Sequence, residues 1–594
     1  MFFHSFNPLT TEEVERKAAG RRLPDGSAPS DALAGKSFKV LLEGEFAPQQ
    51  LEYKFKTAMD LVVTENGKSY DAPANIVKFG KIVLFSHLVP GTSRGWHIII
   101  DTKTNAVTAF ETWFGISIPI GGDLFGTRPP TGTREVAREV QRHYHFGWAD
   151  FGGTAKPEKL HTTTNRLEGR GLHWKYCCGK EVLTYFPSVV CSTTVELDAP
   201  LDTVTVTYPS DYLRIDDETF IYAKWGVEFA GEMWLEVLDL FEMKAVGLKL
   251  GFDESDEFVY AFHNAVLEVT GDAAHLETIT LNGDKNPPMA MITGRGARYA
   301  YRPKDLDPPM THDEVEEAVK TQRIFEFGGP NIMMSGNTLA FNYDLVGKQF
   351  KLTYDHVQTP YAWSAKNKPD KLLKEFEYDF SGRETLKWRV PGGAWNEEKY
   401  VCFEPAKDIY FFSHMVTGDA QHSNVTHAVD YSTGLTTCVW ARVGSWTSEW
   451  EISATALFGY AEGEGIAPYP FSKRHGFTTD LVGHSYAWAY SDSMSSIHVY
   501  SSPISSSWTI FQDDNSGGAS WSSPCFFVKL RDDAYLFEWV EENCNGSQGL
   551  VCFNPQIMHD GGFFFGAGHA GLSLNITGAY ARKLGEFDVN KYFE

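Results

Sequence analysis

The sequence predicts a mainly β protein built from four modules in two duplicated pairs, with short helices between them. Three observations lead to this prediction. Aromatic residues make up 14% of the 594 residues, a high share that is common in β-rich proteins. Six segments of the first half recur in the same order in the second half. Much of the chain consists of short alternating or wholly apolar runs that turn residues separate.

The charge of the chain restricts its partners. It has 53 Lys and Arg against 77 Asp and Glu, a formal net charge of −24 at pH 7. Such a surface repels nucleic acid and anionic membranes. No apolar window is long enough to cross a membrane, and the first residues lack the apolar segment of a secretory signal. We therefore expect a cytoplasmic protein without nucleic-acid or membrane partners, in which the eight cysteines stay reduced.

The first expected element is a short helix. PLTTEEVE near the start places Glu13 three residues after Thr10, which is the spacing of a capping box at a helix N-terminus. PMTHDEVE repeats this spacing with Thr311 and Glu314. Each half should therefore open with a short helix.

Further repeats divide each half into two modules. LAGKSFKV, FSHLV and YLRIDDETFIYAKW in the first half correspond to LVGKQFKL, FSHMV and KLRDDAYLFEW in the second. The modules begin near Leu33, Leu167, Leu345 and Leu481. Between the first two, REVAREVQRHYHFGW has the apolar stripe of a helix. The expected division is helix and first module in 1–130, second module in 131–284, linker and helix in 285–344, third module in 345–460 and fourth in 461–594.

Within the modules the runs are typical of β-strands. KQFKLTY, DIYFFSHMV and SIHVYSS are short and rich in aromatic or β-branched residues. About 110 residues of such strands form a closed up-and-down barrel or a sandwich. Closure would remove the exposed edges of a long antiparallel sheet.

The order of the motifs resembles the MoaF family, named for a molybdenum-cofactor biosynthesis protein F. The matching motifs are DLVG at 480–483, LRDD at 530–533 and YLFEW at 535–539, whereas the first half has Arg166 in place of Asp480. Members pair two lipocalin-like (calycin) barrels. The resemblance therefore implies four lipocalin-like antiparallel β-barrels in two duplicated pairs, with short connecting helices. It brings no catalytic residues with it, but long duplicated members resemble proteins of fungal secondary metabolism.

Cofactor motifs do not occur in the sequence. No glycine-rich segment has the context of a nucleotide-binding loop, and HExxH and GxSxG are missing. His143 and His145 form an HxH pair, but no third ligand follows at a recognisable spacing, so a surface or capping role is favoured over a metal site. We expect no metal and no cofactor.

The repeated FSH motifs offer titratable candidates. Alternation along a strand places Tyr410 and His414 on one face, and His87 takes the same place in the first half. A histidine that faces a cavity could transfer a proton near neutral pH. The alternative is a histidine at a strand end that is bonded to a loop carbonyl.

Aromatic residues of the second and fourth modules are the candidate ligand-binding residues. Each module has a Trp–Tyr pair on one face of its first strand and a tyrosine on the next strand. These rings either fill a core or line a ligand pocket. Glu538 is a possible acid or base beside Trp539. The candidate ligand-binding set contains Trp174, Tyr176, Tyr185, Trp488, Tyr490, Tyr500, Trp539, Tyr410 and His87, and the candidate catalytic residues are His414 and Glu538.

These residues suggest a cofactor-independent lyase or isomerase, cyclase-like, that acts on an apolar or aromatic small-molecule intermediate of secondary metabolism. Its partner would be a hydrophobic substrate held in an aromatic-lined barrel. The alternatives are a non-catalytic lipocalin-like carrier for a hydrophobic metabolite and a scaffold with filled barrels. The sequence leaves the oligomeric state open.

Overall fold

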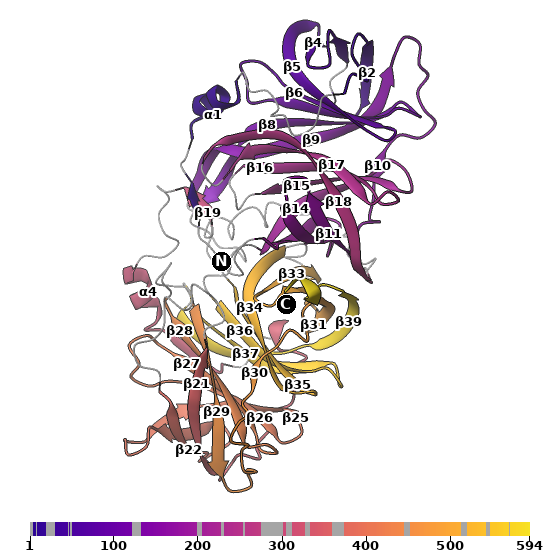
Figure 1. The fold of residues 1–594 in the computed structure, drawn as a ribbon. Helices are drawn as coiled ribbons and strands as arrows, with labels where there is room; N and C mark the ends of the chain where they lie inside the picture. The colour runs from indigo at the N-terminus through magenta and orange to yellow at the C-terminus, as the bar shows by residue number, and fades with distance from the viewer. Residues whose placement is uncertain are drawn as a thin grey trace.

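A computed structural model describes most of the chain, and the description below covers the residues outside the following segments: 1–3, 7–8, 20–29, 45–46, 48–49, 121–131, 199–204, 227–230, 254–255, 275–300, 304–311, 327–332, 359–372, 445–451, 513–519, 542–546, 569–570 and 594. Four antiparallel barrels are arranged in a row (Figure 1). Barrel 1 and barrel 2 come from the first half, barrel 4 follows barrel 2 in space, and barrel 3 lies at the far end. The predicted fold class is confirmed.

Barrel 1 is a closed ring of eight strands in sequence order. The ring closes where the last strand pairs with the first as well as with its sequence neighbour. Its strands are β2 (Ser37–Glu43), β3 (Leu51–Phe55), β4 (Asp60–Glu65), β5 (Lys68–Phe79), β6 (Ile82–Leu88), β7 (Gly95–Asp101), β8 (Ala106–Ile120) and β9 (Gly132–Asp150).

The helix predicted from REVAREVQRHYHFGW is wrong, because this segment lies in β9. Its second half alternates strictly, with His143, His145 and Gly147 on one face and Tyr144 and Phe146 on the other, and this period of two is that of a strand. Since β9 completes barrel 1, the expected boundary at residue 130 falls between two paired strands.

Barrel 2 has the same strand order and closes through pairing of its first and last strands. A two-residue strand, β10 (Thr162–Thr163), pairs with β14 outside the ring. The ring consists of β11 (Arg170–Tyr176), β12 (Glu181–Tyr185), β13 (Cys191–Glu196), β14 (Thr205–Arg214), β15 (Thr219–Gly226), β16 (Glu232–Asp239), β17 (Lys244–Phe252) and β18 (Phe258–Ala273).

Barrel 3 repeats the order of barrel 1 and is nearly closed. The strand equivalent to β5 is divided into β24 and β25, which lie at the two edges of the sheet. The strands are β21 (Gln349–Gln358), β22 (Glu375–Asp379), β23 (Thr385–Arg389), β24 (Asn396–Lys399), β25 (Val401–Ala406), β26 (Ile409–Met415), β27 (Asn424–Asp430), β28 (Leu435–Val443) and β29 (Ile452–Gly463).

Barrel 4 repeats the order of barrel 2, with its last strand paired to its first. Short strand β30 (Gly476–Phe477) pairs with β34. The barrel contains β31 (His484–Ala489), β32 (Ser495–Ser502), β33 (Ser505–Gln512), β34 (Ser520–Arg531), β35 (Ala534–Glu541), β36 (Ser547–Asn554), β37 (His559–Gly568), β38 (Gly571–Thr577) and β39 (Tyr580–Phe587).

Each half opens with a short helix, as predicted. Helix α1 (Thr11–Ala18) has the full capping box, with Thr10 accepting a hydrogen bond from the Glu13 backbone and Glu13 accepting one from Thr10. Helix α4 (His312–Ala318) begins directly after Thr311, whose cap lies outside the described residues. None of the helices in the described part of the chain is long and apolar enough to cross a membrane. The remaining short elements are β1 (His4–Phe6), which pairs with β19 (Tyr301–Pro303), β20 (Gln322–Ile324), which pairs with β38, and the 3-10 turn η3 (Asn590–Tyr592).

Buried hydroxyl groups line the contact between barrel 2 and barrel 4. The Thr207 hydroxyl lies 2.6 Å from that of Ser522, and Thr205 contacts Ser505. The Cys191 thiol donates to Ser520 at 3.1 Å. Three residue pairs between β18 and β39 also join the two barrels into one sheet. The two halves are therefore held together by polar contacts as well as by apolar packing.

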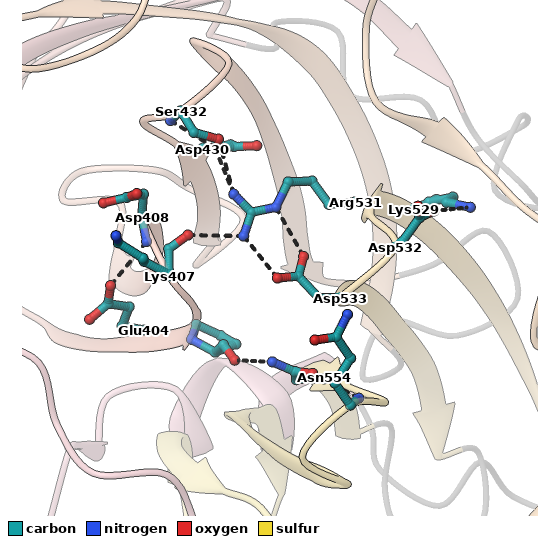
Figure 2. Close-up of polar contacts among 12 residues, drawn as sticks. Glu404, Lys407, Asp408, Asp430, Ser432, Lys529, Arg531, Asp532, Asp533 and Asn554 are labelled. Carbon is teal, nitrogen blue, oxygen red and sulfur yellow. Dashed lines mark hydrogen bonds and ion pairs between the residues drawn. The ribbon is translucent and has the colours of Figure 1, made fainter.

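Barrel 3 and barrel 4 are joined by an arginine (Figure 2). Arg531 donates to its neighbour Asp533, and it reaches across to Asp430 and to the Lys407 carbonyl at 2.9 Å. In the first half, Arg214 pairs with Asp217, and the adjacent Asp216 forms an ion pair with Lys81 of barrel 1. The loop that follows Leu213-Arg214 in barrel 2, and its counterpart after Leu530-Arg531 in barrel 4, thus contact the first barrel of their half at the same turn.

Candidate functional site

Four of the predicted aromatic residues come together inside barrel 4. Trp488 lies on β31 and Tyr490 directly after its end, Tyr500 lies on β32 and Trp539 on β35, and all four are at most 5% exposed. The ring of Phe537 links two of them, since its centroid lies 4.8 Å from those of both Tyr500 and Trp539. The interior of this barrel is therefore lined by aromatic rings.

A buried carboxyl group faces this interior from Glu541. Alternation along β35 places it on the same face as Phe537 and Trp539. Its carboxylate accepts hydrogen bonds from the indole N–H of Trp539 at 2.6 Å and of Trp508 at 3.0 Å, and from the Ser523 hydroxyl at 3.2 Å. Burial raises the pKa of Glu541 to about 7, although these three donors act in the opposite direction.

Glu538, the predicted acid or base, lies on the other face of β35. It is fully buried, on the outward face that it shares with Leu536, and Gln548 donates a hydrogen bond to it at 3.2 Å. The structure therefore separates Glu538 from Trp539 and the other aromatic residues of the interior.

Several polar atoms of the barrel 4 interior are buried without a hydrogen-bond partner. They are Nε1 of Trp488, Nε1 of Trp521 and Nδ1 of His498. The other ring nitrogen of His498 bonds to the Tyr490 hydroxyl at 3.3 Å, and burial lowers the pKa of His498 to about 3. Buried polar groups are rarely unpaired, so these three atoms are potential hydrogen-bonding groups of the barrel 4 interior.

His414 lies in barrel 3, away from these aromatic residues, in a chain of buried hydrogen bonds. Its Nδ1 donates to the Met415 carbonyl at 2.7 Å, so Nε2 must accept the proton of the Tyr378 hydroxyl at 2.8 Å. His427 Nε2 then donates to Tyr378 at 2.7 Å, and its Nδ1 accepts from Tyr354 at 2.6 Å. Every proton in this chain is assigned, and burial lowers the pKa of His414 to about 4. The arrangement is that of a neutral polar core.

The other predicted residues of barrels 1 and 3 are also separate from barrel 4. His87 lies in the core of barrel 1, where its Nε2 bonds to the Tyr53 hydroxyl at 3.3 Å. Tyr410 is half-buried beside Tyr431 at the edge of the barrel 3 core. Neither shares an interior with Trp488 or Trp539.

In barrel 2, two of the three predicted aromatic residues face the interior. Trp174 and Tyr176 stack with their ring centroids 6.0 Å apart. The side chain of Tyr185 points outward from barrel 2, and its hydroxyl donates to the Ser501 carbonyl of barrel 4 at 3.1 Å. The side chain of the next residue, Phe186, points into the barrel. Tyr185 is therefore a contact between the halves, because a shift of one residue along a strand reverses the face.

A shift of one residue between the two sequences also affects β15 of barrel 2, where it places a polar side chain in the interior. Counted from the start of each strand, the third inward position of β15 is Lys224, whereas the third inward position of β35 is Trp539. Lys224 donates to the Thr194 hydroxyl at 3.1 Å, and burial lowers its pKa to about 8. Aligning Trp225 with Trp539 by their letters hides this lysine, while alternation from Phe220 would have found it.

A carboxylate and an imidazole accompany Lys224. Glu236 accepts hydrogen bonds from His263 Nε2 at 2.7 Å and from the Tyr176 hydroxyl at 3.3 Å, while its second carboxylate oxygen is buried without a partner. A Cβ atom at Gly247 would overlap that oxygen, so the glycine makes room for the carboxylate. Barrel 2 therefore has charged and polar side chains at one end of its interior, where barrel 4 has the ring of Trp539.

Comparison with known proteins identifies one part of the chain. Residues 475–587, which span β30 to β39, match the family model described as MoaF C-terminal domain. No curated protein matches the chain. A crystal structure from Burkholderia vietnamiensis, described as a "putative beta-lactamase", is similar over 18% of this chain and 95% of its own, with 15% identity and a TM-score of 0.16. At that TM-score the likeness supports no statement about activity.

Proposed function

We propose that barrel 4, whose residues 475–587 match the MoaF C-terminal domain, holds the working site of a cofactor-independent lyase or isomerase. Its substrate is an apolar or aromatic small molecule, an intermediate of secondary metabolism. The rings of Trp488, Tyr500 and Trp539 supply an apolar surface of fixed shape for such a molecule. Holding a flexible substrate in a reactive conformation is itself a large contribution to rate.

The observation that carries the proposal is the position of the Glu541 carboxyl group, which is buried inside the aromatic interior of barrel 4. A carboxyl group with a pKa of about 7 is close to half ionised at neutral pH, so it can both accept and donate a proton. Trp539 and Trp508 hold the carboxylate in one orientation through their indole N–H groups. An isomerase removes a proton at one atom of the substrate and returns it at another, whereas a lyase removes a proton as the bond to a leaving group breaks and gives that proton to the leaving group; one such carboxyl group suffices for either.

A carrier is the second candidate, because the unpaired Trp488, Trp521 and His498 atoms favour binding without requiring a reaction. The first step of the test finds the ligand. The protein is incubated with an organic extract of small metabolites, and retained molecules are identified by native mass spectrometry. If no molecule is retained, the interior is a filled core and both candidate functions fail.

Two variants then separate enzyme from carrier. Glu541→Gln removes this carboxyl group from the interior, while Glu538→Gln makes the same change on the outward face of the same strand. For an enzyme, Glu541→Gln lowers turnover of the retained molecule about 10²- to 10⁴-fold with its dissociation constant nearly unchanged. For a carrier, there is no turnover in any variant. Equal turnover in wild type and Glu541→Gln would contradict the assigned role of Glu541.

A further inference from the structure

A group of metal-ligating side chains lies in barrel 1. Glu111 on β8 is directly opposite His143 on β9, and His145 follows on the same face of β9. One ligand atom from each of the three residues lies within 4.8 Å of the others. Glu111 continues the row of Val107 and Ala109 that faces the barrel core, so the group stands at the inner wall of the barrel.

The surroundings of this group suit a bound cation. His145 is 5% exposed, and its Nε2 is buried with no hydrogen-bond partner. The rings of Trp96 and Trp113 lie 6.2 Å from His145 and 4.9 Å from His143, and they limit how far the imidazoles can turn.

One carboxylate oxygen of Glu111 already accepts hydrogen bonds from Arg94. Arg94 donates from Nε to Glu111 Oε1 at 3.0 Å, and it also pairs with Glu65 at 2.8 Å. The second oxygen, Oε2, remains for a metal ion, and Glu65 offsets the positive charge of Arg94. An ion that binds here therefore uses a carboxylate that a second contact holds in place, as is common for metal ligands.

We propose that Glu111, His143 and His145 bind a divalent transition-metal ion such as Zn²⁺. Two imidazoles and one carboxylate form the donor set of many three-ligand zinc and non-haem iron sites, in which further positions stay open for water or substrate. His143 is exposed, so the ion reaches the group from solvent. The reaction proposed for barrel 4 does not use this ion, because Glu541 and its aromatic residues lie two barrels away (Figure 1).

The test measures metal binding directly. Metal-free protein is titrated with Zn²⁺ by calorimetry and with Co²⁺ by visible absorption, whose bands report the coordination geometry. We expect one ion per chain at this site, with affinity lowered at least tenfold in His143→Gln and in Glu111→Gln. His143 is exposed, so its substitution leaves the fold intact, and circular dichroism checks both variants.

His173→Gln is the matched control. His173 also lies beside two carboxylates, Glu181 at 2.9 Å and Glu268 at 3.9 Å, but on barrel 2. The proposal requires that this variant bind metal as the wild type does. Unchanged affinity in His143→Gln, or an equal loss in His173→Gln, would overturn it. Ligand retention by barrel 4 is measured in the same proteins, so failure of the metal site and failure of the proposed function are distinguishable.

Discussion

Glu541 and Glu538 lie three residues apart on one strand and face opposite sides of the wall of barrel 4. Glu541 points into the aromatic interior, where two indole N–H groups bind it, and Glu538 points outward and accepts a hydrogen bond from Gln548. An odd spacing along a strand always has this effect. The pair therefore provides two identical substitutions whose consequences differ only through their surroundings.

The first prediction concerns stability against pH. Folding raises the pKa of Glu541 from 4.5 to about 7, so the ionised carboxylate destabilises the folded state. This cost is complete above pH 7 and disappears as the pH falls toward 4.5. The free energy of unfolding of Glu541→Gln should therefore exceed that of the wild type by up to about 3 kcal/mol at pH 8, with a much smaller difference at pH 5. Urea titrations at both pH values measure this, and an equal difference at the two would contradict it.

The second prediction concerns the polar core of barrel 3. Tyr378→Phe removes the hydroxyl that joins His414 to His427 and leaves two buried ring nitrogens without a partner. Such a loss typically lowers the free energy of unfolding by about 1–3 kcal/mol. Tyr410→Phe, at the half-buried edge of the same core, should change stability little. If the two variants denature alike, the hydrogen-bond chain contributes nothing.

The third prediction concerns Gly247 in barrel 2. A methyl group there would overlap the Glu236 carboxylate and the His263 ring, so Gly247→Ala should destabilise the protein by about 1–3 kcal/mol. Gly476→Ala is the control, since nothing lies within 4 Å of the added atom. Thermal unfolding compares the two variants, and equal melting temperatures would show that the barrel accommodates the methyl group.

The fourth prediction concerns the hydroxyl pair between the halves. Thr207→Val leaves the Ser522 hydroxyl buried and unpaired, and Ser522→Ala leaves the Thr207 hydroxyl with only Thr193. Each single change should lower stability by about 1 kcal/mol, whereas the double change should cost less than the sum of the two. A double-mutant cycle in urea measures the coupling, and strict additivity would mean that the two hydroxyls do not interact.

The sequence predicts the four barrels because each strand carries its own alternation and the repeats fix the order of the strands. It also brings Trp488, Tyr490, Tyr500 and Trp539 to one interior for the same local reason. The sequence-based candidates do not include Glu541, because the YLFEW motif ends at Trp539. Alternation from Tyr535 extends to Glu541.

Two other features of the structure depend on pairing between distant segments, which the sequence pattern does not specify. The first half of the β9 segment has an apolar spacing that also fits a helix, while its second half alternates like a strand, and pairing with β2 and β8 makes the whole segment a strand. The approach of Glu111 to His143 depends on the register between two strands joined by a long connection, and no local pattern specifies a register.

The contact between barrel 2 and barrel 4 brings equivalent surfaces face to face. Strands β13 and β14 pack on β33 and β34, which hold the same places in the order of the other barrel. This is the form of an isologous interface, the kind that builds two-fold homodimers, enclosed within one chain. Dilution separates a homodimer, but here the covalent connection keeps the two surfaces at high effective concentration. A homodimer must also carry the same residue at both equivalent positions. The single chain is free of that restriction, and so it can keep Lys224 in one barrel and Trp539 at the corresponding place in the other.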